Sequence, residues 1–254
     1  MPMATDRYVN QVRLLVGVLP FIAVEPVFAL KGGSAINLFH RNLPRLSVDV
    51  DLTYLRVQDR TTSLADIDEN LDRIATAIND QGRFSARRIA GGGNADMRLQ
   101  VSSGNVRIKI ETSPVARGTV LAPNLMRVSD TVEEQFGFAE ALVVLFEDLF
   151  AGKICAALDR QHPRDLFDVR DLLANEGIGD DLRRAFIAYL LMHNRPMHEV
   201  LAPRRRDITQ EFERGFDGMT QHPVALDPFA HHGIPVGSLH PQLHLCIPYA
   251  DILL

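Results

Sequence analysis

The chain has 254 residues, with 46% hydrophobic and 23% charged residues and a formal net charge of −5 at pH 7. These are ordinary values for globular proteins, so they exclude wholesale disorder, and the length allows one large domain or two modest ones. Because the net charge is negative, any nucleic-acid site must be a local basic patch. The two cysteines, Cys155 and Cys246, exclude a disulfide framework and favour a reducing compartment, the cytoplasm.

The N-terminal region predicts a helix over residues 6 to 19, a loop, and a buried strand near residues 27 to 31. The apolar segment 14–30 resembles a signal peptide. Glu25 interrupts it, however, and Pro20 and Pro26 exclude one continuous membrane helix. We therefore expect no membrane segment.

The next stretch predicts a turn, a short helix and a strand. The glycines of GGSAINLFHR allow a tight turn, and Pro44 ends the helix that follows. LSVDVDLTYL then alternates strictly between apolar and polar residues, which indicates a strand with one apolar and one polar face. Asp49 and Asp51 lie on the polar face.

Further along, residues 63 to 80 predict a helix with Ser63 as its N-cap. Strands are expected in FSARRIA, ADMRLQVS and NVRIKIETSPV, and Pro114 and Pro123 are expected to close this α/β half. From about residue 139 the pattern becomes helical. Helices are expected over residues 141–160, 163–177, 180–194 and 207–216.

The two aspartates raise a question of charge. Two carboxylates on one sheet face repel unless a cation or hydrogen bonds compensate them. Mg²⁺ is a natural compensation, because it takes one or two carboxylates together with substrate phosphates and water. A calcium site, or a solvated face with two acids, is the alternative.

The neighbouring residues favour a triphosphate site. Backbone amides of Gly33 and Ser34 can form a phosphate cradle, although a plain turn with Ser34 as N-cap is an equally good interpretation of these residues. Glu111 is the candidate third carboxylate, for a second metal or for the acceptor proton. It also fits a cross-strand salt bridge.

Two separated segments carry a family resemblance. LKGGSAINLFHRNLPRLSVDVDL, and then EDLFAGKICAALDRQHPRDLFDVRDLL, resemble motifs of the AbiEii/AbiGii toxin nucleotidyltransferases of type IV toxin–antitoxin systems. This family includes MenT-like toxins and lies within the DNA-polymerase-β-like nucleotidyltransferase superfamily. The resemblance covers residues 8 to 220.

The resemblance implies an α+β fold, with a mixed sheet and flanking helices followed by a helical domain. We expect the nucleotidyltransferase domain in residues 1–135, the helical domain in 136–220 and an atypical, disordered tail in 221–254. Either a disordered extension or an altered reading frame would produce this tail. Its five histidines match no zinc pattern.

The resemblance also assigns site residues. It implies that Asp49 and Asp51, with Glu111 less closely matched, hold the metal, and that Asp168 is an essential acid. The residues implied to bind the nucleotide are Gly33, Ser34, Ser47, Lys153, Arg164 and Asp165.

Lys153 lies on an otherwise apolar helix, where an unpaired ammonium would be costly. A buried pair with Asp148 or Glu147 would explain it, and so would a contact to phosphate. On the next helix Asp165 and Asp168 are three residues apart and can share a face.

The expected function is an Mg²⁺- or Mn²⁺-dependent transfer of a nucleotide from an NTP to an RNA acceptor, the tRNA 3′ end by resemblance. The adjacent gene would encode an antitoxin that need not bind directly. The alternatives are an aminoglycoside-like small-molecule nucleotidyltransferase and an inactive nucleotide-binding homologue. Basic residues that could contact RNA lie at Arg83, Arg87 and Arg88 and at 204–206.

Overall fold

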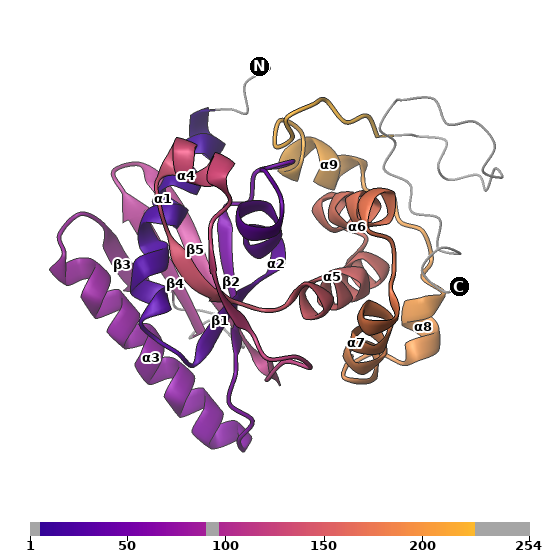
Figure 1. Ribbon diagram of the computed structural model, residues 1–254, viewed down its shortest axis with the longest axis horizontal. Helices are drawn as coiled ribbons and strands as arrows, with labels where there is room; N and C mark the ends of the chain where they lie inside the picture. The colour runs from indigo at the N-terminus through magenta and orange to yellow at the C-terminus, as the bar shows by residue number, and fades with distance from the viewer. Residues whose placement is uncertain (1–5, 90–96, 227–254) are drawn as a thin grey trace. The chain divides into compact units, whose positions relative to one another are not determined.

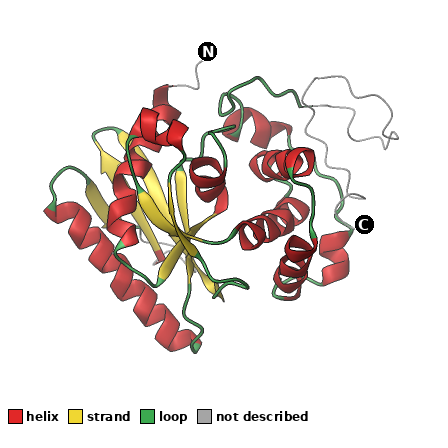
Figure 2. Ribbon diagram, viewed as in Figure 1, coloured by secondary structure: helices red, strands yellow, loops and turns green. Residues whose placement is uncertain are grey.

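The computed structural model describes residues 6–89 and 97–226. The described chain divides into two compact units, with Leu145 ending the first and Phe146 beginning the second. Each unit is described by itself below (Figures 1 and 2). The domain boundaries predicted after residues 135 and 220 stay predictions, and most of the predicted tail, from residue 227 on, lies outside the described residues.

The first unit is a mixed sheet with helices. The sheet has seven strands in the order β3-β4-β5-β2-β1-β7-β6. Its strands are β1 (Phe28–Lys31), β2 (Asp49–Tyr54), β3 (Ser85–Arg88), β4 (Arg98–Ser103), β5 (Val106–Arg117), β6 (Asn124–Arg127) and β7 (Glu140–Val143). Its helices are α1 (Asp6–Ala23), α2 (Gly32–Ala35), a π-helical turn η1 (Ile36–His40), α3 (Arg60–Asp80) and α4 (Asp130–Phe136).

The register of the central strands positions the charged residues. Strand β1 pairs antiparallel with β2, and Lys31 lies opposite Asp51. Strand β2 pairs parallel with β5, and Asp51 lies opposite Glu111. Strand β4 pairs antiparallel with β5, and Arg98 lies opposite Glu111. Because partners opposite one another point to the same sheet face, these four residues form one row across the sheet.

Helices α1 and α3 pack against the sheet and against each other, whereas α2 packs against β1 and β2 (Figure 1). Helix α1 buries its apolar side, including Val12, Leu15 and Leu19. The apolar face of β2 is equally buried, since Val50 and Leu52 are inaccessible to solvent. A ligand can therefore contact β2 only on its polar face.

The second unit is helical. It contains α5 (Phe146–Arg160), α6 (Pro163–Asn175), α7 (Asp180–Leu191), α8 (Met197–Leu201) and α9 (Thr209–Gly215). Helix α5 lies at its centre and packs against α6, α7 and α8. Helix α9 packs on α6, where the rings of Phe167 and Phe216 are 5.4 Å apart.

Two predicted helix starts are wrong. Helix α3 begins earlier than residue 63, because the Asp59 side chain caps it by accepting a hydrogen bond from the Thr62 amide at 3.0 Å. Ser63 lies buried inside this helix. The predicted helix over 141–160 begins only at Phe146, since the preceding residues form strand β7. Short apolar runs fit either structure by periodicity, and pairing of Val143 with Leu30 of β1 decides the strand.

Other boundaries also differ from the sequence prediction. Helix α1 continues through Pro20 to Ala23, and β5 continues past Pro114 to Arg117. The helical segment after GGS stops at His40 as a π-helical turn, before Pro44. Across residues 6–89 and 97–226, no helix is long and apolar enough to cross a membrane.

Candidate functional site

The Gly32–Gly33 turn begins α2 directly after β1 and lies against two groups of the predicted site. Gly32 has φ +73°, and a Cβ there would lie 2.4 Å from a carboxylate oxygen of Asp51. A Cβ on Gly33 would lie 2.8 Å from Oγ of Ser47 and 2.6 Å from the guanidinium of Arg45. Only glycine allows this approach without displacing its neighbours. The turn therefore forms a cradle directly beside the Asp51 carboxylate.

Ser34 ties this turn to strand β2. Its side chain is fully buried, and its hydroxyl contacts Oγ of Ser47 at 3.1 Å. The same hydroxyl donates a hydrogen bond to the backbone carbonyl of Asp49. The hydroxyl thus fixes the position of β2, so a phosphate contact at Ser34 would have to come from its backbone amide.

Arg45 and Asn37 hold the glycine turn through hydrogen bonds. Neither residue was identified from the sequence. The Asn37 side chain donates to the Gly33 carbonyl at 2.7 Å and accepts from the Arg45 amide at 3.3 Å. The Arg45 side chain is 1% exposed and donates to the Leu46 carbonyl at 3.1 Å. A buried arginine and asparagine are costly unless bonded, so this network holds the turn in one conformation.

Lys31 is a further residue that the sequence reasoning missed. It is the last residue of β1 and lies opposite Asp51. Burial lowers the pKa of its ammonium, while the Asp51 carboxylate acts in the opposite direction. The signal was present in the sequence, because a lysine that ends an apolar strand next to Gly-Gly needs a charged partner.

Glu111 occupies the place in the sheet that the sequence predicted for a third carboxylate. It lies opposite Asp51, and its side chain is paired with Arg98 at 3.4 Å. The structure thus has the cross-strand salt bridge that was one of the two explanations. A metal-binding role for Glu111 stays a prediction.

The acidic residues fit a small, hard cation. Asp49 and Asp51 are half-buried carboxylates two residues apart on one strand face, and the Asp51 carboxylate lies against Gly32. Among the described residues no group of three or more His, Cys, Asp or Glu is placed to hold a metal ion. Two carboxylates are nevertheless sufficient for Mg²⁺, because phosphates and water supply its other ligands.

Lys153 is the centre of a buried charge cluster in the second unit. Its ammonium lies 2.9 Å from an oxygen of Asp165 and 3.1 Å from an oxygen of Asp168. All three side chains are at most 8% exposed. The lysine comes from α5 and both acids come from α6, so the pair with Asp148 or Glu147 that the sequence allowed is not the one formed.

Asp165 is held ionised by two cations. Arg160 donates to both of its oxygens, at 2.5 and 3.1 Å. Burial opposes ionisation of Asp165, but the Lys153 ammonium and the Arg160 guanidinium together lower its pKa below the ordinary value. Desolvation is thus outweighed by charge pairing.

Asp148, a buried acid of α5, has a different partner from the acids of α6. It accepts a hydrogen bond from the Tyr189 hydroxyl at 3.0 Å. Burial, and then the Asp148 charge, raise the pKa of that hydroxyl above its ordinary value. This contact joins α5 to α7 and leaves Lys153 to the acids of α6.

Arg164 and Asp165 open helix α6 as the sequence predicted. The cap is His162, whose Nδ1 accepts a hydrogen bond from the Arg164 amide at 3.2 Å. The side chain of Arg164 is half-buried. The cap places Asp165 in the first turn, where the helix dipole favours an acid.

The structure therefore brings the predicted residues together in two groups. The first unit contains the cradle, both aspartates and Glu111, and the second contains Lys153 with Asp165 and Asp168.

Comparison with known proteins identifies the family. The model of the family described as nucleotidyl transferase AbiEii toxin, type IV TA system, matches residues 13–231. The chain belongs to this family. It is accordingly a nucleotidyltransferase of the toxin class, and the resemblance predicted from the two sequence segments is confirmed. No curated protein matches the chain.

A solved structure supports the same fold. MenT4, the nucleotidyltransferase toxin Rv2826c from Mycobacterium tuberculosis H37Rv, aligns with a TM-score of 0.58 at 17% sequence identity. The alignment covers 79% of this chain and 73% of that one. At this identity the likeness concerns the fold, and it confirms the predicted α+β nucleotidyltransferase architecture. Members of such a family use an NTP and, as a rule, a divalent metal, and a toxin of this class implies an antitoxin.

Proposed function

We propose that this AbiEii-family protein transfers a nucleoside monophosphate from an NTP to the 3′ end of an RNA, with tRNA as the acceptor, and that it uses Mg²⁺. One observation carries the proposal: the Asp51 carboxylate lies against a glycine turn that any Cβ would block, on the strand that Ser34 fixes through Asp49. A carboxylate beside the backbone of a glycine turn is an arrangement that can hold a metal-bound triphosphate.

Asp49 and Asp51 would hold the divalent cation, and Glu111 would serve either as a further ligand or as the base for the acceptor hydroxyl. When bound, this cation neutralises phosphate charge and polarises the phosphoryl oxygens. The backbone amides of Gly33 and Ser34 would bind phosphate oxygens, and Ser47 would shape the wall of the cradle. Mn²⁺ would fit the same oxygen ligands.

In the second unit, we assign Lys153 to the triphosphate. Its ammonium has three hydrogens, and the described contacts place two carboxylates around it, so the third hydrogen can be donated to a phosphate oxygen. Asp165 and Asp168 would orient the ammonium, and Arg164 would add positive charge near the phosphates.

The reaction itself is a substitution at phosphorus. A hydroxyl oxygen of the acceptor forms a bond to the α-phosphorus, the bond from that phosphorus to the bridging oxygen breaks, and pyrophosphate leaves. The hydroxyl proton passes to a base, for which the Glu111 carboxylate is the candidate. Positioning and charge neutralisation supply most of the rate in such reactions.

Incubation of the protein with each α-labelled NTP, Mg²⁺ and total tRNA tests the proposal. Label on tRNA from one NTP in preference to the others is the expected result. Label on small hydroxyl compounds such as aminoglycosides, with none on tRNA, would contradict the proposed acceptor. We also propose that the antitoxin is encoded by the adjacent gene, that it need not bind the toxin directly, and that the toxin acts in the cytoplasm.

A further inference from the structure

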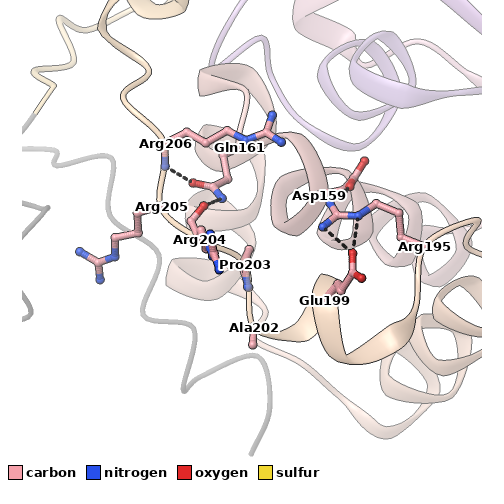
Figure 3. A pocket seen from close by; sticks show the side chains of 9 residues that line it. All are labelled: Asp159, Gln161, Arg195, Glu199, Ala202, Pro203, Arg204, Arg205 and Arg206. Carbon is pink, nitrogen blue, oxygen red and sulfur yellow. Dashed lines mark hydrogen bonds and ion pairs between the residues drawn. The ribbon is translucent and has the colours of Figure 1, made fainter.

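The second unit contains a pocket of about 490 Å³ that the reaction described above does not use (Figure 3). Four arginines and two carboxylates contribute to its lining. Its lining residues are Asp159, Gln161, Arg195, Glu199 and the segment 202–206.

The acids of this pocket already have a cationic partner. Arg195 contacts Asp159 at 2.5 Å and Glu199 at 3.3 Å. The side chains of Arg204, Arg205 and Arg206 are exposed, and among the described residues none of them takes part in an ion pair. The excess positive charge of the pocket therefore belongs to this run of three.

The arginine run is held by one buried side chain. Gln161, which is 4% exposed, donates to the Arg204 carbonyl at 2.7 Å and accepts from the Arg206 amide at 3.0 Å. These two bonds bracket Arg205 and fix the backbone of the run, which lies outside any helix or strand (Figure 3).

Gln161 itself has an unusual backbone conformation. Its φ is 52°, in the left-handed region that residues with a side chain rarely adopt. A left-handed residue commonly ends a helix, and here Gln161 follows α5 and its amide donates to the Ala157 carbonyl at 3.2 Å. The two side-chain hydrogen bonds of Gln161 therefore hold the arginine run in one conformation, whereas an ordinary solvated charge run has no such anchor.

The anchor directly continues the helix that carries Lys153. Gln161 follows Arg160, which pairs with Asp165, the partner of Lys153. Lys153 and Gln161 are eight residues apart, about 12 Å along the axis for a helical rise of about 1.5 Å per residue. A polymer bound at the arginine run therefore lies near the proposed triphosphate lysine, inside the same unit.

The directions of the side chains select the ligand. Arg205 and Arg206 extend away from each other (Figure 3). Diverging guanidinium groups cannot converge on one phosphate, but each can bind a different phosphate of a polymer in its two-pronged geometry. The other basic cluster is less available, because Arg88 is paired with Asp68 and Asp72 and Arg83 stacks over Phe84.

We propose that Arg204, Arg205 and Arg206, preset by Gln161, bind successive phosphates of the RNA acceptor. The inference rests on the proposed RNA acceptor and adds the surface that holds it. None of the described residues that line the pocket is aromatic, so these residues contact the RNA backbone and contribute affinity without base selection.

Fluorescence anisotropy of the full chain with labelled tRNA, without NTP, over a series of salt concentrations tests the proposal. In R204A/R205A/R206A, we expect the dissociation constant to rise by about tenfold to a hundredfold at low salt, and the salt slope to fall by about 2, for three lost phosphate contacts at about 0.7 each. The control R183A/R184A/R214A removes the same charge from exposed positions on α7 and α9. It should change the dissociation constant by no more than about twofold and leave the salt slope nearly unchanged.

A second variant tests the anchor without removing charge. Glycine accepts a φ of 52° readily, so Q161G keeps the backbone conformation and removes only the two side-chain bonds. We expect Q161G to weaken tRNA binding by about threefold to tenfold with an unchanged melting temperature, since the arginines lose their fixed spacing.

Several results would overturn the inference. Equal loss of tRNA binding in R204A/R205A/R206A and its charge-matched control would reduce the run to a general charge effect. Loss of NTP binding with retained tRNA binding would assign the arginines to the nucleotide, and loss of binding to the antitoxin alone would make the pocket a protein-docking surface.

The same assays separate this inference from the proposed function. If the triple variant bound tRNA like the wild type while the wild type still labelled tRNA, only the inference would be wrong. If the wild type neither bound nor labelled tRNA, the proposed acceptor would be wrong and the inference would be lost with it.

Discussion

The two groups of predicted site residues differ in burial and in how their charges are compensated. Asp49 and Asp51 are half-buried on a sheet face, next to a glycine cradle. Lys153, Asp165 and Asp168 are buried and compensate one another within 3.1 Å. The second group becomes neutral with Arg160, which also pairs with Asp165 and gives two cations for two carboxylates. The first group is only half-buried, so substitution there should affect mainly chemistry, whereas substitution in the second group should affect both stability and chemistry.

The largest expected effect is at the acidic pair. D49N and D51N each remove a metal ligand while keeping the size of the side chain, so we expect transfer to fall on the order of 10³-fold or more. The melting temperature of D49N should change little, because removing one of two like charges relieves repulsion. D51N should also lower the melting temperature, because Lys31 loses the carboxylate that lies opposite it. Rates of label transfer and thermal melting check this. The exposed strand acid gives a control, E140Q, and a D49N rate near that of the control would refute the assignment.

Next comes the buried lysine. K153M leaves Asp165 and Asp168 without their shared cation, so we expect the free energy of unfolding to fall by about 3 to 5 kcal/mol. In K153M/D165N/D168N no acid needs the missing charge, so stability should largely return. Transfer should stay about a hundredfold below wild type if the ammonium binds phosphate. Denaturant unfolding and transfer assays check both, and recovery of transfer together with stability would mean that Lys153 is only structural.

A glycine substitution tests the contact between the cradle and Asp51. Gly32 and Gly82 have nearly the same positive φ, +73° and +74°, but a Cβ at Gly82 meets nothing within 4 Å. Each alanine variant should therefore lose about 1 to 2 kcal/mol from the backbone strain. Only G32A should also displace the Asp51 carboxylate, and we expect its transfer to fall about tenfold or more beyond that of G82A. Equal transfer by the two variants would show that the cradle is not part of the site.

The smallest effect concerns acid stability. Because the folded-state pKa of Asp165 is lowered, its ionised form stabilises the protein above the unfolded aspartate pKa of about 3.9, and this stabilisation is lost as the pH falls towards the folded value. By pH 3 the loss should be about 1 kcal/mol from this residue. Unfolding measured from pH 6 to pH 3 should show a shallower decline in D165N than in D171N, its matched control on the same helix. A decline of equal slope would contradict the buried charge pairing.

The sequence predicted what depends on local periodicity. Alternation in LSVDVDLTYL located β2 and placed both aspartates on one face, and the 3.6-residue pattern located α6 and α7. Strand β7 was missed, because one glutamate and three apolar residues before a helix carry no periodicity of their own. Its assignment depends on pairing with β1, a contact that is distant in sequence.

The site residues show the same division between what local sequence predicts and what tertiary packing determines. The predicted residues of each group lie together, but their partners were set by tertiary packing: Lys153 pairs with acids of α6, and Lys31 was not identified at all. Buried charges in apolar segments need partners, so both lysines could be flagged from the sequence, but only the fold determines which acids they meet.

Metal binding tests the central claim most directly, because it depends on neither the acceptor nor the turnover. Mn²⁺ titration followed by electron paramagnetic resonance, with a non-hydrolysable NTP analogue present, should show bound Mn²⁺ in the wild type and in the control E140Q. In D49N/D51N the affinity should fall by about a hundredfold or more. Equal Mn²⁺ affinity in D49N/D51N and the wild type would show that the acids of β2 do not hold the metal, and the account of the site would be wrong.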